Sequence, residues 1–214
     1  MRLTPTLLAL ALAAAPLAAQ QHEDHDKSVQ GGGTLPTGWM ARTDNGRPIT
    51  NLKLEVMAPG WHVTTGPAVI LYRDADRADG AFHAVSTIHL FPSSGHAEAF
   101  GVFLGGQNLQ AANQAYTYFL IRGDGKFAIK RRNGTAATTV VDWTDSDAIV
   151  KAKADSAVVN ELSFEVGGDS VTFMVNGKPV HTAAASALDT RGLVGLRVNH
   201  NLNLHVQSLG VHPR

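Results

Sequence analysis

The sequence predicts an all-β protein whose antiparallel strands form a two-sheet sandwich. From Trp39 onward, short runs rich in Val, Phe, Ile, Tyr and Thr alternate with Gly, Asn, Asp and Pro, and hardly any segment has helical periodicity. About ten such strands must close into a barrel or stack as two sheets, because one open sheet would leave an apolar face in water. The runs Ala99–Leu104 and Tyr116–Ile121 are apolar on both faces, which favours a sandwich.

The chain begins with the features of a secretory signal peptide. Arg2 precedes an apolar run of 13 residues, 7–19, which ends in small residues and is followed by a polar stretch. The run is shorter than the ~20 residues that a membrane-spanning helix needs. We therefore expect residues 1–19 to be cleaved off, after Ala19 or Gln20, and the protein to be exported to the periplasm or outside the cell. No membrane span is expected after cleavage, and an uncleaved N-terminal anchor is the alternative.

A leader and a single domain follow the signal peptide. Residues 20–38 are polar and Gly-rich, with too few apolar groups to offset the entropy of ordering them, so we expect a flexible leader. Cleavage leaves about 195 of the 214 residues, which suits one domain with a substantial core. We place this domain at residues 39–214.

Charge and composition exclude several classes of function. Lys plus Arg and Asp plus Glu number 18 each, and no basic stripe with interleaved aromatic residues occurs, so nucleic-acid binding has no electrostatic footprint. Cysteine is absent, which excludes disulfides, thiolate catalysis and sulfur-based zinc sites. No cofactor is expected, and the oligomeric state does not follow from the sequence.

The strand predictions depend on period-two alternation. In the run Phe82–Phe91, for example, Phe82, Ile88 and Leu90 fall on one face. A helical turn is expected at Ala183–Leu188, and residues 147–153 are ambiguous. The other predicted strands are Leu52–Val56, Val69–Arg73, Glu98–Leu104, Tyr116–Arg122, Lys126–Arg131, Leu162–Val166, Val171–Val175, Lys178–His181, Leu193–Asn199 and Leu204–Val211.

Turn residues indicate which neighbouring strands pair. Gly123-Asp124-Gly125 and Asn176-Gly177 lie between apolar runs and predict tight hairpins. Pro179 suits an edge strand, because proline cannot donate a ladder hydrogen bond. We also expect the last two strands, Leu193–Asn199 and Leu204–Val211, to pair across the turn formed by residues 200–203.

Five segments of the predicted domain form a recognisable succession of fold patterns: Glu98–Gly106, Tyr116–Phe127, Asn160–Val166, Val171–Gly177 and Gly192–Leu196. Together they resemble the concanavalin A-like lectin/glucanase jelly-roll superfamily, and they are most similar to its laminin-G-like and 3-keto-disaccharide-hydrolase-like branches. The resemblance spans roughly residues 39–211 and implies a two-sheet jelly roll with a concave face that often holds a sugar. Each segment is a fold pattern and none is a catalytic motif, so fold analogy alone does not choose a function.

The sequence assigns no catalytic residue. Glycanases of this superfamily usually carry two Glu flanking an Asp on one strand, because retaining hydrolysis needs two carboxyl groups about 5–5.5 Å apart. Here Glu161 and Glu165 share a strand face but lie roughly 13 Å apart, at about 3.3 Å per residue. Retaining chemistry on one strand is therefore disfavoured, whereas a pair brought together from distant strands, or a site of His, Asp and Arg, stays open.

Histidine is the enriched polar residue, with ten in the chain. An imidazole can serve as a general base or as a metal ligand near neutral pH. His83 and His89 share a strand face but lie about 20 Å apart, too far to hold one metal, while His200 and His205 flank a turn and could approach each other. Scattered histidines are more often surface residues, and we predict no metal site.

The predicted ligand-binding residues are those that a jelly roll could present on its concave face. Aromatic rings stack on sugar rings, while Arg and Asn side chains hydrogen-bond to hydroxyl groups. The alternative is structural: Trp61 plugs one end of the sandwich, the tyrosines belong to a core, and the asparagines are turn residues. The set comprises Trp61, His62, Tyr116, Tyr118, Arg122, Arg197, Asn199, His200 and Asn201.

Three functions follow from this sequence. The favoured one is an exported, non-catalytic binding module, most plausibly for carbohydrate, and the first alternative is a glycoside-acting enzyme resembling 3-keto-disaccharide hydrolases. The second alternative is a structural or interaction protein of the cell envelope. A shallow cleft with Trp61 or Tyr118 exposed would favour binding. Two carboxylates, or a His–carboxylate pair, at catalytic distance in a cleft would favour the enzyme, and a concave face filled by apolar side chains would favour the third function.

Overall fold

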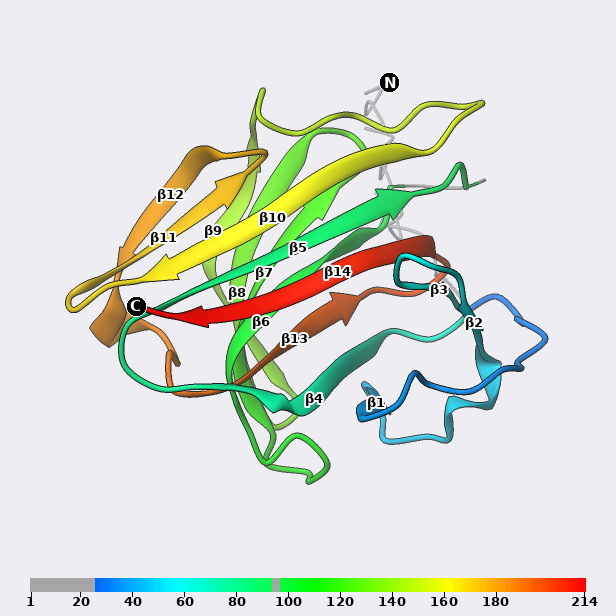
Figure 1. The fold of residues 1–214 in the computed structure, drawn as a ribbon, viewed down its shortest axis with the longest axis horizontal. Helices are drawn as coiled ribbons and strands as arrows, with labels where there is room; N and C mark the ends of the chain where they lie inside the picture. The colour runs from blue at the N-terminus through cyan, green and yellow to red at the C-terminus, as the bar shows by residue number, and fades with distance from the viewer. Residues whose placement is uncertain (1–25, 94–96) are drawn as a thin grey trace, which may run out of the picture.

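The computed structural model describes residues 26–93 and 97–214, so the predicted signal peptide lies outside the described residues. Within them, 14 strands form two stacked antiparallel sheets of seven strands each, as Figure 1 shows. The predicted all-β, two-sheet sandwich is confirmed. No helix in these two ranges is long and apolar enough to cross a membrane.

The first sheet, called the β5 sheet, has the strand order β12-β11-β10-β5-β14-β3-β2. Its C-terminal strand β14 (Asn203–Pro213) lies between β5 (Phe82–Leu90) and β3 (Trp61–Thr65). The remaining strands are β2 (Leu52–Val56), β10 (Val158–Val166), β11 (Ser170–Val175) and β12 (Lys178–Ala184).

The second sheet, called the β6 sheet, has the strand order β1-β4-β13-β6-β7-β8-β9. It supplies the outer face from which four of the nine predicted binding residues project. Its strands are β1 (Trp39–Thr43), β4 (Val69–Ala78), β13 (Gly192–Val198), β6 (Ala99–Gln107), β7 (Ala115–Arg122), β8 (Lys126–Asn133) and β9 (Ala136–Asp145).

The main core lies between the two sheets and follows from the alternation in each strand. Along β5, every second residue from Phe82 to Leu90 is buried and the residues between them are half-buried. Phe119, Phe164 and Phe173, which come from both sheets, meet in this core with ring centroids 5.2 and 6.3 Å apart. Burying each such side chain stabilises the fold by about 1.5–3 kcal/mol.

Two of the three predicted pairings are confirmed and one is wrong. The turns at Asp124-Gly125 and Asn176-Gly177 join β7 to β8 and β11 to β12, and β12, which carries Pro179, is an edge strand. The last two strands do not form a hairpin, because β13 belongs to the β6 sheet and β14 to the β5 sheet. Residues 199–202 therefore carry the chain from one sheet to the other.

Three strands were not predicted from the sequence. They are the short strands β1 and β3 and the edge strand β9, whose residues are mostly exposed. The helical turn expected near residue 185 is present as a 3-10 turn at Ala185–Ala187, and residues 147–153 form no helix or strand.

The described part of the leader lies against the domain. Gly32 forms a parallel bridge with Lys53 of β2, and the amide of Leu54 donates to the Gly32 carbonyl at 2.9 Å. Gly33 has a positive φ of 78°, and a Cβ there would lie 1.7 Å from the Leu54 carbonyl oxygen. Residues 32 and 33 thus lie along the edge strand β2 of the β5 sheet. The flexible leader at residues 20–38 stays a prediction.

Candidate functional site

Seven of the nine predicted binding residues gather on one side of the sandwich. Tyr116, Tyr118 and Arg122 project from β7 on the outer face of the β6 sheet, with Arg197 on β13. The other three members, Asn199, His200 and Asn201, follow in the connection from β13 to β14. The site is therefore built from β7, β13 and this connection.

Trp61 and His62 do not join this group. The Trp61 ring is buried between the sheets, where it packs edge-on against Trp39 at 5.0 Å. Its neighbour His62 points the opposite way, onto the outer face of the β5 sheet beside Phe91 and His205. Trp61 therefore has the structural role that the sequence analysis gave as the alternative, since its ring fills space inside the sandwich.

Aromatic side chains fill the middle of the outer face of the β6 sheet. Tyr116 lies 5.1 Å from Phe103 and 5.4 Å from Tyr118, measured between ring centroids. Tyr116 is 1% exposed and Tyr118 7%, and burial raises the pKa of both phenols. Because these rings are covered, this stretch is a second small core and offers no open stacking surface.

Glycine at position 195 makes the second core possible. A Cβ at this position would lie 2.5 Å from the ring of Phe103 and 2.5 Å from the carbonyl oxygen of Leu71. Only a residue without a side chain lets the Phe103 ring lie flat on β13. Within the Gly-Leu-Val-Gly-Leu run of residues 192–196, packing thus requires a glycine at position 195.

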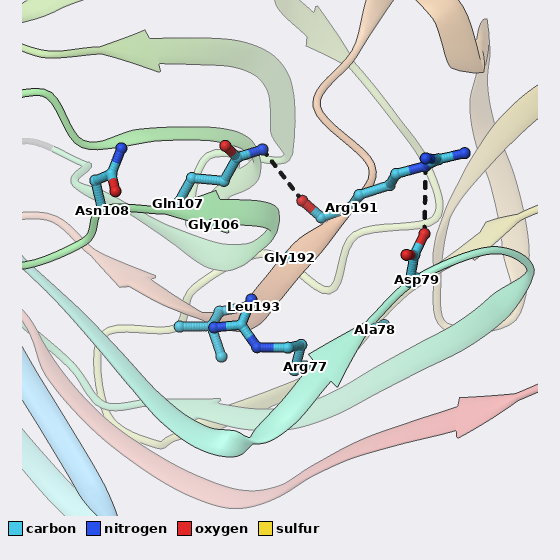
Figure 2. Close-up of a pocket in the computed structure, with 9 residues that line it drawn as sticks. All are labelled: Arg77, Ala78, Asp79, Gly106, Gln107, Asn108, Arg191, Gly192 and Leu193. Carbon is cyan, nitrogen blue, oxygen red and sulfur yellow. Dashed lines mark hydrogen bonds and ion pairs between the residues drawn. The ribbon is translucent and has the colours of Figure 1, made fainter.

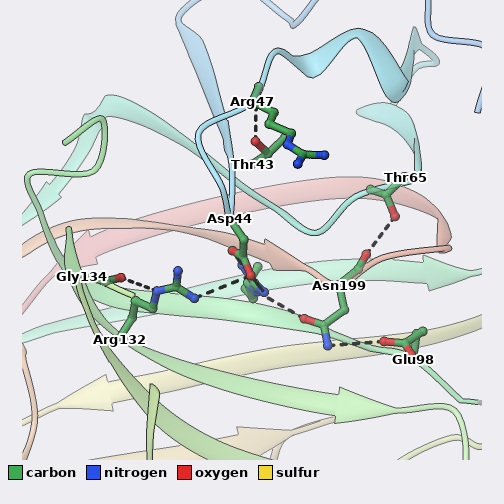
Figure 3. A network of polar contacts seen from close by, with 9 residues as sticks. Thr43, Asp44, Arg47, Thr65, Glu98, Arg132, Gly134 and Asn199 are labelled. Carbon is green, nitrogen blue, oxygen red and sulfur yellow. Dashed lines mark hydrogen bonds and ion pairs between the residues drawn. The ribbon is translucent and has the colours of Figure 1, made fainter. Parts of the chain in front are cut away.

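A polar network occupies one end of the same sheet (Figure 3). Asp44, which follows β1, accepts hydrogen bonds from both terminal nitrogens of Arg197, the longer at 2.8 Å. Arg132 on β8 lies 3.6 Å from the same carboxylate. Arg197 also donates from Nε to the Asn199 side chain at 3.2 Å, so one carboxylate and one amide hold the guanidinium in a fixed plane.

Burial and charge act in opposite directions on this pair. Burial would raise the pKa of Asp44, but the hydrogen bond and charge of Arg197, with the charges of Arg132 and Arg42, lower it below its ordinary value. Burial would likewise lower the pKa of Arg197, yet the contact with Asp44 raises it. Both groups are therefore ionised at neutral pH, and the network is a fixed charge pair.

A histidine and two carboxylates continue the network. His200 Nε2 lies 3.0 Å from Glu98 Oε1, and His200 Nδ1 lies 3.4 Å from Asp26 Oδ1. The Asn199 side chain donates to Glu98 at 3.5 Å, which links His200 to Arg197. This is the His–carboxylate arrangement that the enzyme alternative requires.

A pocket of about 250 Å³ opens beside this network and is called the Asp44 pocket. Its walls come from the leader, the segment after β1, the β3–β4 connection and the β13–β14 connection. Three polar residues that line the pocket, Asn45, Arg47 and Asn51, are exposed to solvent. The lining residues are Asp26, Thr43, Asp44, Asn45, Arg47, Pro48, Asn51, Pro67, Ala68 and His200.

Trp143 is a candidate that the sequence analysis missed. The guanidinium of Arg122 lies 4.4 Å from the Trp143 ring centroid and the Lys130 ammonium 5.8 Å from it. Asp124 fixes Arg122 through hydrogen bonds to Nε and Nη2 of 3.1 and 2.5 Å. The ring is half-buried at the edge of the aromatic cluster, so part of one aromatic surface stays accessible.

A second hollow, of about 410 Å³, lies at the end of the β6 sheet opposite the polar network and is shown in Figure 2. Arg191 pairs with Asp79 at 3.2 Å, and both side chains are more than 70% exposed. Gln107 donates to the Arg191 carbonyl at 3.4 Å. These groups are ordinary solvated surface residues, and the hollow lacks the buried, mutually fixed polar groups of the Asp44 pocket.

The histidines that the structure describes belong to no three-residue metal-binding group. No group of three or more His, Cys, Asp or Glu side chains in ranges 26–93 and 97–214 is arranged to hold a metal ion. His205 lies beside His62 and His89 on the β5 sheet, away from His200.

No protein-family model matches the chain, and no curated protein matches it. Solved structures do match. The carbohydrate-binding module CBM66 from Bacillus subtilis aligns at 15% identity and a TM-score of 0.58, covering 82% of this chain and 96% of its own. A glycoside hydrolase family 16 endo-glucanase from Bacteroides ovatus aligns at 8% identity and a TM-score of 0.57, covering 81% and 94%.

The carbohydrate recognition domain of Emp46p, in its potassium-bound form, aligns at 10% identity and a TM-score of 0.56, covering 82% of this chain and 88% of its own. At these identities the likenesses concern the fold, which is the concanavalin A-like jelly-roll sandwich predicted from the sequence. The closer similarity to laminin-G-like and 3-keto-disaccharide-hydrolase-like branches stays a prediction.

Proposed function

We propose that this protein is an exported, non-catalytic module that binds carbohydrate in the Asp44 pocket. The observation that carries the proposal is the fixed charge network of Asp44, Arg197 and Asn199 beside a small pocket lined by exposed amide and guanidinium groups. A preorganised set of donors and acceptors in a concave site suits the hydroxyl groups of a sugar. The jelly-roll neighbours include a carbohydrate-binding module and a carbohydrate recognition domain, which supports this class of ligand.

The proposal places the ligand at one end of the β6 sheet, because its middle is filled. Tyr118 and Trp61 are both buried, so the exposed stacking surface expected of an open groove is missing at these positions. A pocket of about 250 Å³ has room for a single sugar unit or a chain end rather than a long glycan. Export agrees with such a role and rests on the predicted signal peptide.

The test is a glycan array probed with the purified protein and three variants. Asn45→Ala and Arg47→Ala remove exposed side chains at the pocket mouth, and each should weaken binding about tenfold, the effect of losing roughly 1.4 kcal/mol of contact energy. Arg191→Ala, a matched change in the hollow of Figure 2, should bind like wild type. If glycan binding fell equally in all three variants, or only in Arg191→Ala, the Asp44 pocket would not be the binding site.

A glycoside-acting enzyme is the second candidate, and the contact between His200 and Glu98 at 3.0 Å favours it. A neutral imidazole beside a carboxylate can serve as a general base. Oxidised and unoxidised disaccharides incubated with the protein distinguish the two functions. Product that disappears in Glu98→Gln would establish the enzyme, whereas binding without product supports the module. If neither binding nor product is observed, the remaining function is that of a structural or interaction protein of the cell envelope.

A further inference from the structure

Three histidines lie in one row on the outer face of the β5 sheet, on the other side of the sandwich from the Asp44 pocket. His205 on β14 is directly opposite His62 on β3 and directly opposite His89 on β5. The ring centroids of His62 and His205 are 6.0 Å apart, and those of His89 and His205 are 5.3 Å apart. We call His62, His89 and His205 the histidine row.

The hydrogen bonds of the row specify a neutral tautomer. His205 Nε2 lies 2.8 Å from the carbonyl oxygen of Pro59, and since a carbonyl only accepts, this nitrogen carries the proton. His62 and His205 are 9% and 8% exposed, and the Nδ1 atom of each is buried with no hydrogen-bond partner. Protonation would therefore add an N–H group that is buried without an acceptor.

The groups around the row do not offset a positive charge. Glu55 on β2 is opposite His62, but it is half-exposed and pairs with Lys53 at 3.1 Å. On the other flank, Val159 of β10 is opposite His89. Beside the row lie the neutral groups Phe91, Asn203 and Gln207, of which the two amides accept from His62 and His89. Burial, together with the charges of His89 and His62, lowers the pKa of His205 against the opposing effect of the Pro59 bond.

The row fastens the β2–β3 hairpin to β14. Pro59 lies in the turn between β2 and β3, so the bond from His205 ties this turn to the neighbouring strand. Gly60 in the same turn lies so close to β14 that a Cβ would be 2.0 Å from the Val206 carbonyl oxygen. At the far end of β3, the Thr65 hydroxyl donates to the Asn199 carbonyl at 2.8 Å, which connects the hairpin to the Asp44 pocket.

We propose that the histidine row is a pH-sensitive clamp, which holds the β2–β3 hairpin on β14 while its imidazoles are neutral and releases it in mildly acidic solution. Protonating one ring creates an unpaired buried charge, and protonating two places like charges about 5–6 Å apart. Because burial lowers the pKa of His205 in the closed state, the clamp is closed above an ordinary imidazole pKa of about 6.5 and opens as the pH falls below it. The proposal does not depend on which ligand the protein binds.

Hydrogen exchange followed by NMR or mass spectrometry tests the clamp on the intact protein. Protection factors, which correct for the intrinsic pH dependence of exchange, should fall for amides 61–65 between pH 7.5 and pH 5.0 while those of β6 and β7 stay constant. The expected fall is about tenfold for each unit by which the pKa of His205 is lower in the closed state than in the open state. The imidazole carbon shift of His205 should titrate below pH 6.5 in the same series.

Variants separate the clamp from a general effect of acid. His205→Gln keeps a neutral N–H donor for Pro59 and should keep amides 61–65 equally protected at both pH values. If this variant does not fold, His89→Gln, which removes one neighbouring charge, should reduce the loss of protection. His83→Gln is the matched control. His83 lies on β5 and on the same face as His89, but it stacks on His212, outside the row.

Three results would overturn the proposal. The first is a wild-type hairpin equally protected at pH 7.5 and pH 5.0. The second is a His205→Gln variant that loses protection as much as wild type. The third is stabilisation by equimolar Zn²⁺ at pH 7.5 that His205→Gln abolishes, which would make the row a metal site.

Discussion

Replacing Asp44 by Asn tests whether the network beside the pocket is a coupled buried charge pair. The Arg197 side chain is 8% exposed and that of Asp44 29%, so Asp44→Asn leaves a nearly buried guanidinium without the carboxylate charge that pairs with it, and only one oxygen at position 44 can still accept. Removing one partner of a fully buried pair costs about 3–5 kcal/mol, and the partial exposure of Asp44 reduces our expectation to about 2–3 kcal/mol. That is a large part of a total stability of about 5–15 kcal/mol.

Urea unfolding followed by circular dichroism measures this cost against a matched control. Asp145→Asn breaks an ion pair with Lys126 of 2.9 Å whose carboxylate is 78% exposed, and should cost less than about 1 kcal/mol. Adding Arg197→Met to Asp44→Asn should recover part of the loss, because it removes the unpaired charge. A cost for Asp44→Asn no larger than that for Asp145→Asn would refute this account.

The acid dependence of the same variant gives a second measurement. The pKa of Asp44 is lower in the folded protein than its ordinary value of 3.8, so its contribution to stability is present above that value and is lost as the pH falls through the folded pKa. The difference between wild type and Asp44→Asn should therefore narrow below pH 3.8. Because the ordinary pKa of an imidazole is about 6.5, an effect confined to pH values below 3.8 can be separated from the histidine clamp.

Two further substitutions test the packing of the outer face of the β6 sheet and the anchoring of the connection between β9 and β10. Gly195→Ala should destabilise the protein by about 1–3 kcal/mol, because the added Cβ would collide with Phe103 and the backbone of Leu71. Gly168 has open space around it, so Gly168→Ala should leave the stability nearly unchanged. Thermal melts of the two variants compare these effects. Asn160→Ala should cost about 2–3 kcal/mol in urea unfolding, because the buried amide bonds both the N–H and the C=O of Val150 at 2.8 and 3.0 Å; a loss under 0.5 kcal/mol, on the order of an ordinary surface change, would contradict this.

Local alternation predicted most of the fold, because a strand in a sandwich must show its burial in every second residue. The run from Leu52 to Val56 was predicted with the boundaries that β2 has. Sheet membership is different, since a short polar connection such as residues 199–202 looks the same in a hairpin as in a crossing between sheets. The edge strand β9 escaped prediction because an exposed strand rich in Ala and Thr carries little alternation.

The sequence identified part of the candidate site. Arg197, Asn199 and His200 are among the predicted residues, and the structure places them near the end of β13 and in the connection that follows it. Asp44 was missed because it pairs with a residue 153 positions away, and no local pattern reports such a contact. The Asp44-Asn45-Gly46 turn signal was present and could have marked the segment, but it did not indicate a partner.

The central claim is that a saccharide occupies the Asp44 pocket, and NMR chemical-shift mapping tests it most directly. The protein, labelled with ¹⁵N, is titrated with the saccharide that scores highest on the glycan array. The account predicts that shifted amides cluster at residues 43–51, 66–68 and 199–203. Shifts confined to residues 106–108 and 191–193, or to the histidine row, would contradict it.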